Sequence, residues 1–353
     1  MKDPIASDTE GSSKVRPPSL PQKIDSDAIA VPEGVTPAIE VKNLYRSFFG
    51  VQAVRGISFS IAPGQVIGFV GANGAGKTTT MRIIATLDYP TGGSVEVCGT
   101  DVVQFPSEVR RKIGWMPDDY GTYNNMTVLE YLDFFARALG YKANDRRQRV
   151  EEVMAFTDLD KLSDRLINKL SKGMGQRLCL GRALIHDPDV LILDEPAAGL
   201  DPKARVELKH LIRILAEEGK TVFISSHILS ELGEMCDSLL FINQGQIIHH
   251  GSAESLKKGS TSSTLVTVEV ADNPAKLVDW ATMAPNVTFK EATKTGARIE
   301  IDSIEPDVIA LVLKRMINEG IPVIEFHKEE RKLEDAFIEI LGEIEASGQA
   351  IVS

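Results

Sequence analysis

The 353-residue chain has few cysteines, no long hydrophobic run and no excess of positive charge. Its three cysteines, Cys98, Cys179 and Cys236, lie far apart and form no C-x-x-C pair. This pattern excludes a disulfide scaffold and is typical of a reducing cytosol, so we expect three small buried side chains. No segment approaches the roughly 18 apolar residues of a membrane span, and no apolar run at the N-terminus marks a signal peptide. We therefore expect any membrane part to belong to another chain.

The net charge of -11 argues against general affinity for nucleic acid or for anionic lipid, because both favour a basic surface. Hydrophobic residues make up 43% and charged residues 25%, an ordinary globular mix. The length suggests about two domains and allows a sizeable core. We expect no nucleic-acid partner.

Residues 1–37 are rich in proline, serine and charged residues and show no hydrophobic periodicity, so we expect a disordered tail. An α/β pattern then begins and continues to residue 258. A helical insertion over about residues 110–184 interrupts it, with amphipathic stretches at Thr127–Gly140 and Asn144–Phe156. Short apolar runs typical of buried parallel strands lie on either side, at Gln65–Val70, Asp189–Leu193 and Thr221–Ser225.

Residues 259–345 form a second, smaller unit, and residues 346–353 a tail. From Leu265 the pattern reads β-α-β-β-α-β and ends in a helix at KLEDAFIEIL. This order predicts a small α+β accessory domain of the ferredoxin-like kind.

The segment GANGAGKT fits the G-x-x-x-x-G-K-[ST] pattern between a buried strand and a helix. Its glycines let several backbone N–H groups turn toward one anion, beside the positive end of the helix dipole. Lys77 offers a cation to the β and γ phosphates, and Thr78 offers a hydroxyl to Mg²⁺. A glycine turn ahead of a helix is the alternative. We expect the nucleotide to be bound by Gly71, Asn73, Gly74, Ala75, Gly76, Lys77, Thr78 and Thr79.

Two acids follow the apolar strand in VLILDEP. Carboxylates at the end of a buried strand are costly unless they face a cation or a site. Asp194 is placed to hold Mg²⁺ and Glu195 to orient the attacking water, with capping of the next turn as the alternative. His227 follows the buried strand TVFIS and would hydrogen-bond the γ-phosphate, with a structural histidine as the alternative.

In this order, the motifs GANGAGKTT, LSKGMGQR, VLILDEP, AGLD and SSH resemble the ATP-binding cassette (ABC) ATPases. The resemblance covers about Ala38 to Gly251 and implies a P-loop NTPase cassette of the ABC type over residues 38–258, with ATP and Mg²⁺ as cofactors. It implies that two cassettes, as a homodimer or as this chain paired with another cassette, dimerise head to tail around two ATP in the ATP-bound state. Phe48 would stack on adenine, with a core role as the alternative.

In this family the signature motif of one chain contacts the ATP of the other chain in the dimer. Ser171, Gly173 and Met174 would make this contact, and Asp201 would lie at the interface.

This sequence departs from the usual motifs of the family at two places. Lys172 and Met174 stand where the family usually has glycine and glutamine. Asp118 stands where the family usually has a glutamine that touches Mg²⁺, and aspartate can still ligate that cation.

The resemblance implies the motor subunit of an ABC transporter, peripheral on the cytoplasmic face of the membrane and joined to a separate permease. The C-terminal unit resembles the accessory domain of drug-exporter and antibiotic-resistance cassettes, which favours export. A soluble ATPase of translation or DNA maintenance is the first alternative. A slowly hydrolysing regulatory module is the second, and Asp118 is the residue that supports it.

Overall fold

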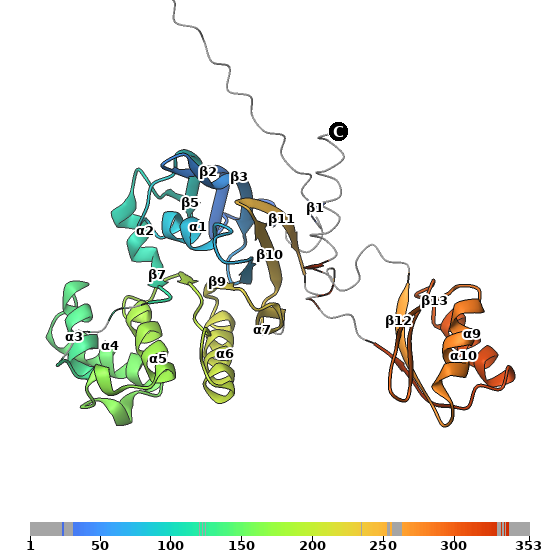
Figure 1. Ribbon diagram of the computed structural model, residues 1–353. Helices are drawn as coiled ribbons and strands as arrows, with labels where there is room; N and C mark the ends of the chain where they lie inside the picture. The colour runs from blue at the N-terminus through green and yellow to red at the C-terminus, as the bar shows by residue number, and fades with distance from the viewer. Residues whose placement is uncertain are drawn as a thin grey trace, which may run out of the picture.

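The computed structural model describes residues 23–24, 31–119, 121, 123, 125–233, 235–252, 255, 263–329, 333, 335, 337 and 338. Their helices and strands form one large mixed sheet, a smaller antiparallel sheet beside it, a helical region and a C-terminal α+β unit (Figure 1). None of the helices among these residues is long and apolar enough to cross a membrane.

The large sheet has the order β1-β11-β10-β4-β9-β8-β7. The neighbours from β10 to β7 are parallel, and β11 pairs with β10 in the antiparallel sense. Because β4, β8 and β9 are adjacent and parallel, their carboxyl ends meet at one edge, where functional groups gather in such sheets. The strands are β1 (Lys23–Ile24), β4 (Val66–Val70), β7 (Ile113–Met116), β8 (Val190–Leu193), β9 (Thr221–Ser226), β10 (Ser238–Asn243) and β11 (Gln246–Gly251).

One face of this sheet packs against the antiparallel sheet and α1. The aromatic side chains of Phe69 and Phe223, from adjacent strands, stack at 5.1 Å, and Phe59 of the antiparallel sheet lies 5.8 Å from Phe223. This core holds the phosphate loop between rigid elements. The elements on this side are β2 (Ile39–Phe48), β3 (Val51–Ile61), α1 (Lys77–Ile84), β5 (Gly92–Val97), β6 (Thr100–Asp101) and α2 (Pro106–Lys112).

The other face is covered by helices, with a second core between them and the sheet. The predicted helix after Thr127 is confirmed, and Thr127 and Glu130 form the expected capping box. The predicted helical insertion differs at its start, since Ile113–Met116 forms a strand of the large sheet. The helices are α3 (Val128–Ala138), α4 (Ala143–Phe156), η1 (Asp160–Leu162), η2 (Ile167–Lys169), α5 (Lys172–Leu184), α6 (Pro202–Glu217) and α7 (Leu229–Gly233).

Two residues of the predicted disordered tail have a regular structure. Lys23 and Ile24 form β1, which pairs in parallel with His249 and His250 of β11. Backbone hydrogen bonding to the edge of the sheet holds them, a long-range contact that composition does not signal.

The C-terminal unit follows the predicted order β-α-β-β-α-β. Its antiparallel sheet has the order β13-β14-β12-β15, and its own apolar core lies between the sheet and two helices. The alternating burial of β12 is typical of a strand with one covered face. The elements are β12 (Thr264–Val270), α9 (Pro274–Met283), β13 (Val287–Ala292), β14 (Gly296–Ile301), α10 (Pro306–Asn318) and β15 (Val323–Lys328).

The helix predicted at KLEDAFIEIL lies only partly within the described residues, of which Leu333, Asp335, Phe337 and Ile338 are helical. Leu333 and Phe337 pack into the core between the large sheet and its helices, not into the core of the C-terminal unit. The segment at Leu333 and Phe337 therefore packs on the larger unit.

Candidate functional site

The predicted phosphate loop joins β4 to α1. Gly74 and Gly76 have φ angles of 79° and 110°, a region that residues with side chains rarely adopt. A Cβ atom on Gly76 would lie 2.6 Å from the carbonyl oxygen of Ala53, so only glycine fits there. No side chain caps the start of α1 and no acid lies in its first turn. The first N–H groups of α1 are thus available to an anion.

Lys77, at the start of α1, is buried and points back across the loop. Its ammonium donates to the carbonyl oxygen of Gly71 at 2.7 Å and lies 3.4 Å from Oε1 of Glu195. The cation of the phosphate loop and the second acid after β8, far apart in the sequence, therefore meet at the edge of the sheet.

Asp194 ends β8 and is 2% exposed. Its Oδ1 accepts a hydrogen bond from the hydroxyl of Ser225 at 2.7 Å, and its carboxylate also hydrogen-bonds the side chain of Thr78. Burial raises the pKa of Asp194, the hydroxyls of Ser225 and Thr78 lower it, and the nearby charges of Glu195 and Asp118 raise it again, so that the net direction is upward. Asp118 thus lies within electrostatic reach of this carboxylate.

Glu195 connects Lys77 to His227. Its Oε2 lies 2.8 Å from Nδ1 of His227, which follows β9 and is exposed. The backbone of Glu195 has a φ of 50°, in the left-handed region that non-glycine residues avoid at a cost of about 1–3 kcal/mol. Strain of this kind is found where the surroundings fix a side chain in place.

Ser225 belongs to the SSH motif, but the sequence predicted no role for it in the site. It lies in β9, two positions before His227, and connects both acids: besides its bond to Asp194, its hydroxyl accepts from the backbone N–H of Glu195 at 2.8 Å. The available signal was its position in the SSH motif, directly after the apolar residues of the strand.

Phe48 ends β2 and is 37% exposed, with the guanidinium of Arg46 lying 4.2 Å from its ring centroid. This exposure does not fit the alternative of a core residue. An exposed ring with a cation on one face is suited to stacking with a flat ligand.

The signature residues lie on other elements. Ser171 is the N-cap of α5, where its hydroxyl accepts from the backbone N–H of Met174 at 3.4 Å. Gly173 packs closely on α6, since a Cβ atom there would lie 2.9 Å from the Cβ of Ala204. Lys172 extends over Gly199, whose added Cβ atom would lie 2.6 Å from its ammonium.

Asp201 is the N-cap of α6, and its Oδ1 accepts from the N–H of Ala204 at 2.9 Å. Ala204 is therefore close to both Gly173 and Asp201. The predicted signature and the AGLD motif share one surface, at the adjacent starts of α5 and α6.

The profile of the family described as "ABC transporter" matches residues 54–198. The ABC transporter ATP-binding protein NatA of Bacillus subtilis is 39% identical over 216 residues, which are 61% of this chain and 88% of NatA. The Nod factor export ATP-binding protein I of Burkholderia orbicola is 33% identical over 304 residues, which are 86% of this chain and 97% of that protein.

A solved structure, "Dimeric Structure of MJ0796, a Bacterial ABC Transporter Cassette", matches with a TM-score of 0.57 and 26% identity, covering 62% of this chain and 99% of that one. The chain therefore belongs to the ATP-binding proteins of ABC transporters, and it is an ATP-binding motor subunit whose ATP hydrolysis is coupled to transport. The prediction of this family from five ordered motifs is confirmed.

Proposed function

We propose that this chain drives an exporter by hydrolysing ATP at the array of Lys77, Glu195 and His227. The observation that carries the proposal is the meeting of these three side chains, with 3.4 Å and 2.8 Å between their charged or polar atoms. A cation, a carboxylate and an imidazole at the end of adjacent parallel strands have the chemistry that phosphoryl transfer to water requires.

In this proposal the backbone of the phosphate loop, from Gly71 to Thr79, binds the phosphates, and Lys77 moves its ammonium from the loop carbonyls to the β and γ phosphates. The carboxylate of Glu195 orients a water molecule and accepts its proton. The water oxygen bonds to the γ-phosphorus, and ADP leaves with the bridging oxygen. His227 donates a hydrogen bond to the γ-phosphate, and its contact with Glu195 holds the carboxylate in place.

The oxygen donors of the site fit Mg²⁺. Asp194 is a buried carboxylate whose side-chain partners, within the described part of the chain, are the hydroxyls of Ser225 and Thr78. Carboxylate and hydroxyl oxygens are hard ligands of the type this cation prefers. Thr78, Asp194 and Asp118 would hold it, and it would supply positive charge to the phosphates.

The surface made by Ser171, Gly173, Met174 and Asp201 would face the ATP of a second copy of the chain. The structure of the MJ0796 cassette is described as dimeric, and the N–H groups at the start of α5 are suited to a phosphate. Phe48 would stack on the adenine, where its exposed ring is accessible.

A separate permease is the second expected partner, which would hold this chain on the cytoplasmic face of the membrane. The name of the relative from Burkholderia orbicola supports export, because that protein matches over 97% of its length, including the C-terminal region. We further propose that the C-terminal unit is ferredoxin-like, on the basis of its element order and its sheet order β13-β14-β12-β15.

Binding and turnover of ATP test the proposal on the full chain. The wild-type protein should hydrolyse ATP in the presence of MgCl2, and Lys77→Ala should lose most of its ATP affinity because the loop loses its cation. A matched control is Lys112→Ala, which removes a lysine that hydrogen-bonds Thr100 away from the loop. Unchanged affinity in Lys77→Ala would contradict the assignment of the phosphate loop.

A further inference from the structure

Ser225 is a fully buried side chain that joins the two acids of the site. It is 0% exposed, and its strand lies in the middle of the large sheet between β4 and β8. Its single hydroxyl donates to Oδ1 of Asp194 at 2.7 Å and accepts from the N–H of Glu195 at 2.8 Å. A serine hydroxyl has one proton to donate, and here the proton goes to the carboxylate.

The second of these bonds fixes a strained part of the backbone. Glu195 has a φ of 50°, and its N–H belongs to the peptide group that joins it to Asp194. With that N–H bonded to Ser225, the peptide group cannot rotate freely. The side chain of Glu195 is thereby directed toward Lys77 and His227.

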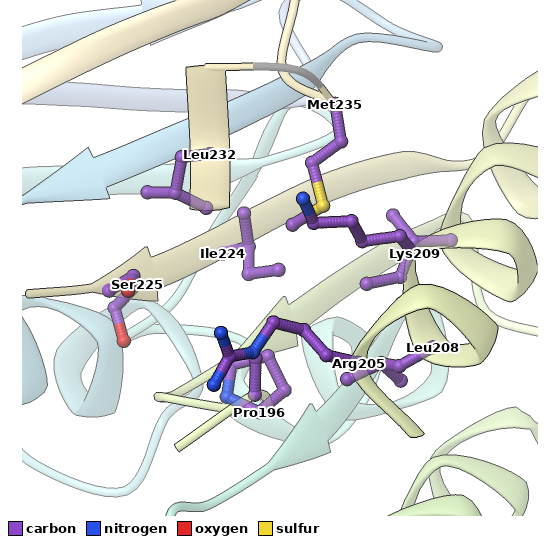
Figure 2. A pocket seen from close by; sticks show the side chains of 11 residues that line it. Pro196, Arg205, Leu208, Lys209, Ile224, Ser225, Leu232 and Met235 are labelled. Atoms are coloured by element: carbon purple, nitrogen blue, oxygen red, sulfur yellow. The ribbon is translucent and has the colours of Figure 1, made fainter. Parts of the chain in front are cut away.

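The complete burial of Ser225 makes its hydroxyl hard to replace, because no solvent reaches the two groups that it bonds. Figure 2 shows Ser225 beside a narrow cleft. Apolar side chains such as Leu208, Ile224 and Leu232 line this cleft, together with the basic side chains of Arg205 and Lys209. A buried donor or acceptor left without a partner costs more than an ordinary hydrogen bond contributes. Loss of the hydroxyl would leave both acids free to shift.

We propose that Ser225 is a positioning residue for ATP hydrolysis, which holds the carboxylate of Asp194 and the backbone of Glu195 in fixed relation through one hydroxyl. The proposal rests on the proposed function of these two acids. In this proposal Ser225 contacts neither ATP nor the attacking water. It acts through Asp194 and Glu195, whose positions it fixes.

The test compares Ser225→Thr with Ser225→Val in the full chain. The two replacements have the same shape, both are suited to a β-strand, and only threonine keeps the hydroxyl. We expect Ser225→Thr to hydrolyse ATP within about 3-fold of wild type and Ser225→Val to lose about 10- to 100-fold in kcat. The affinity for a fluorescent ATP analogue in EDTA should stay within about 3-fold of wild type for both, since the phosphate loop is unchanged.

A second measurement does not depend on turnover. The MgCl2 concentration that half-saturates the change in analogue fluorescence should rise about 10- to 100-fold in Ser225→Val and remain near wild type in Ser225→Thr. Ser238→Ala is the matched control, because Ser238 is buried at the start of β10 and its hydroxyl has no hydrogen-bond partner among the described residues.

Equal turnover and equal MgCl2 dependence of Ser225→Thr and Ser225→Val would overturn the proposal, as would a loss in Ser238→Ala as large as that in Ser225→Val. A wild-type chain without turnover would instead contradict the proposed function. The two failures are therefore distinguishable.

Discussion

Lys77, Glu195 and His227 meet at one edge of the large sheet, where we propose that ATP is hydrolysed. Each follows a different strand, and the parallel arrangement of β4, β8 and β9 brings them together. The carboxylate of Glu195 lies between the ammonium of Lys77 and the imidazole of His227, where we propose that it activates a water molecule. In the proposed mechanism, these three side chains therefore determine the chemistry of ATP hydrolysis.

Glu195→Gln removes the negative charge of the proposed base and keeps the size of the side chain. We expect kcat to fall by about 10²- to 10⁴-fold, the usual range for loss of a general base. ATP affinity should change little, because the phosphate loop is intact. Single-turnover hydrolysis and equilibrium binding of ATP measure the two quantities separately. Glu218→Gln, at the end of α6, is a control outside the site. Turnover of Glu195→Gln near the wild-type rate would rule out this role of Glu195.

Buried titratable residues away from the site make stability depend on pH. His250 in β11 is buried, and Nε2 of its ring has no hydrogen-bond partner in the described part of the chain. Burial, with a smaller effect of the adjacent His249, lowers the pKa of His250 from 6.5 to about 4. The unfolded chain therefore binds one more proton than the folded chain between these two pH values.

This contribution to stability is fully present above pH 6.5 and is lost as the pH falls toward 4. The expected loss is about 3 kcal/mol in the free energy of unfolding. Urea unfolding at a series of pH values measures it. His250→Gln should flatten this part of the curve, whereas His210→Gln, at an exposed position on α6, should keep it. Parallel curves for wild type and His250→Gln would contradict the assignment.

At the element scale, the sequence predicts segments with local signals and misses those fixed by distant contacts. The phosphate loop and the capping box of α3 were predicted because their residues are close in the sequence. Ile113–Met116 was assigned to the helical insertion, because a four-residue strand at the edge of a sheet is too short to show a periodicity of its own. Ser225 was missed for a related reason: Asp194, its partner, lies 31 residues earlier in the chain.

The segment at Leu333 and Phe337 is the clearest example of such a distant contact. Leu333 is 6% exposed and lies in the core of the cassette, where a Cβ atom on Gly233 would be 2.2 Å from its Cδ1. Phe337 stacks on Phe241 at 5.0 Å. Since Gly233 ends α7, which begins two residues after His227, the segment at Leu333 and Phe337 supports the helix that follows the histidine of the site.

Leu333→Ala should therefore reduce the stability of the cassette. We expect a loss of about 2–5 kcal/mol in the free energy of unfolding, as for other large-to-small changes in a core. Ile338→Ala is the control in the same segment, because Ile338 is 65% exposed and surface changes usually stay within about 0.5 kcal/mol. Urea unfolding followed by tryptophan fluorescence compares the two. If both variants lost the same stability, Leu333 would have no special role in the core.

At the scale of the whole molecule, the chain combines an ATPase cassette with a C-terminal unit that has its own core. The family and the ATPase activity were predicted from the order of five motifs. The packing of Leu333 and Phe337 on the cassette was not predicted, because apolar residues in a helix do not indicate which core they join. The boundaries of the domains and the roles of the site residues stay predictions, to be tested by the variants described above.

The most direct test of the proposed mechanism is the mass of the Glu195→Gln chain in solution, measured by light scattering during size-exclusion chromatography with and without ATP and MgCl2. We expect a monomer without nucleotide and twice that mass with it, because ATP held by one phosphate loop would bind the signature of a second copy. Gly173→Trp, which places a large side chain where α5 meets α6, should prevent the change. A Glu195→Gln chain that binds ATP and stays monomeric would contradict the head-to-tail arrangement.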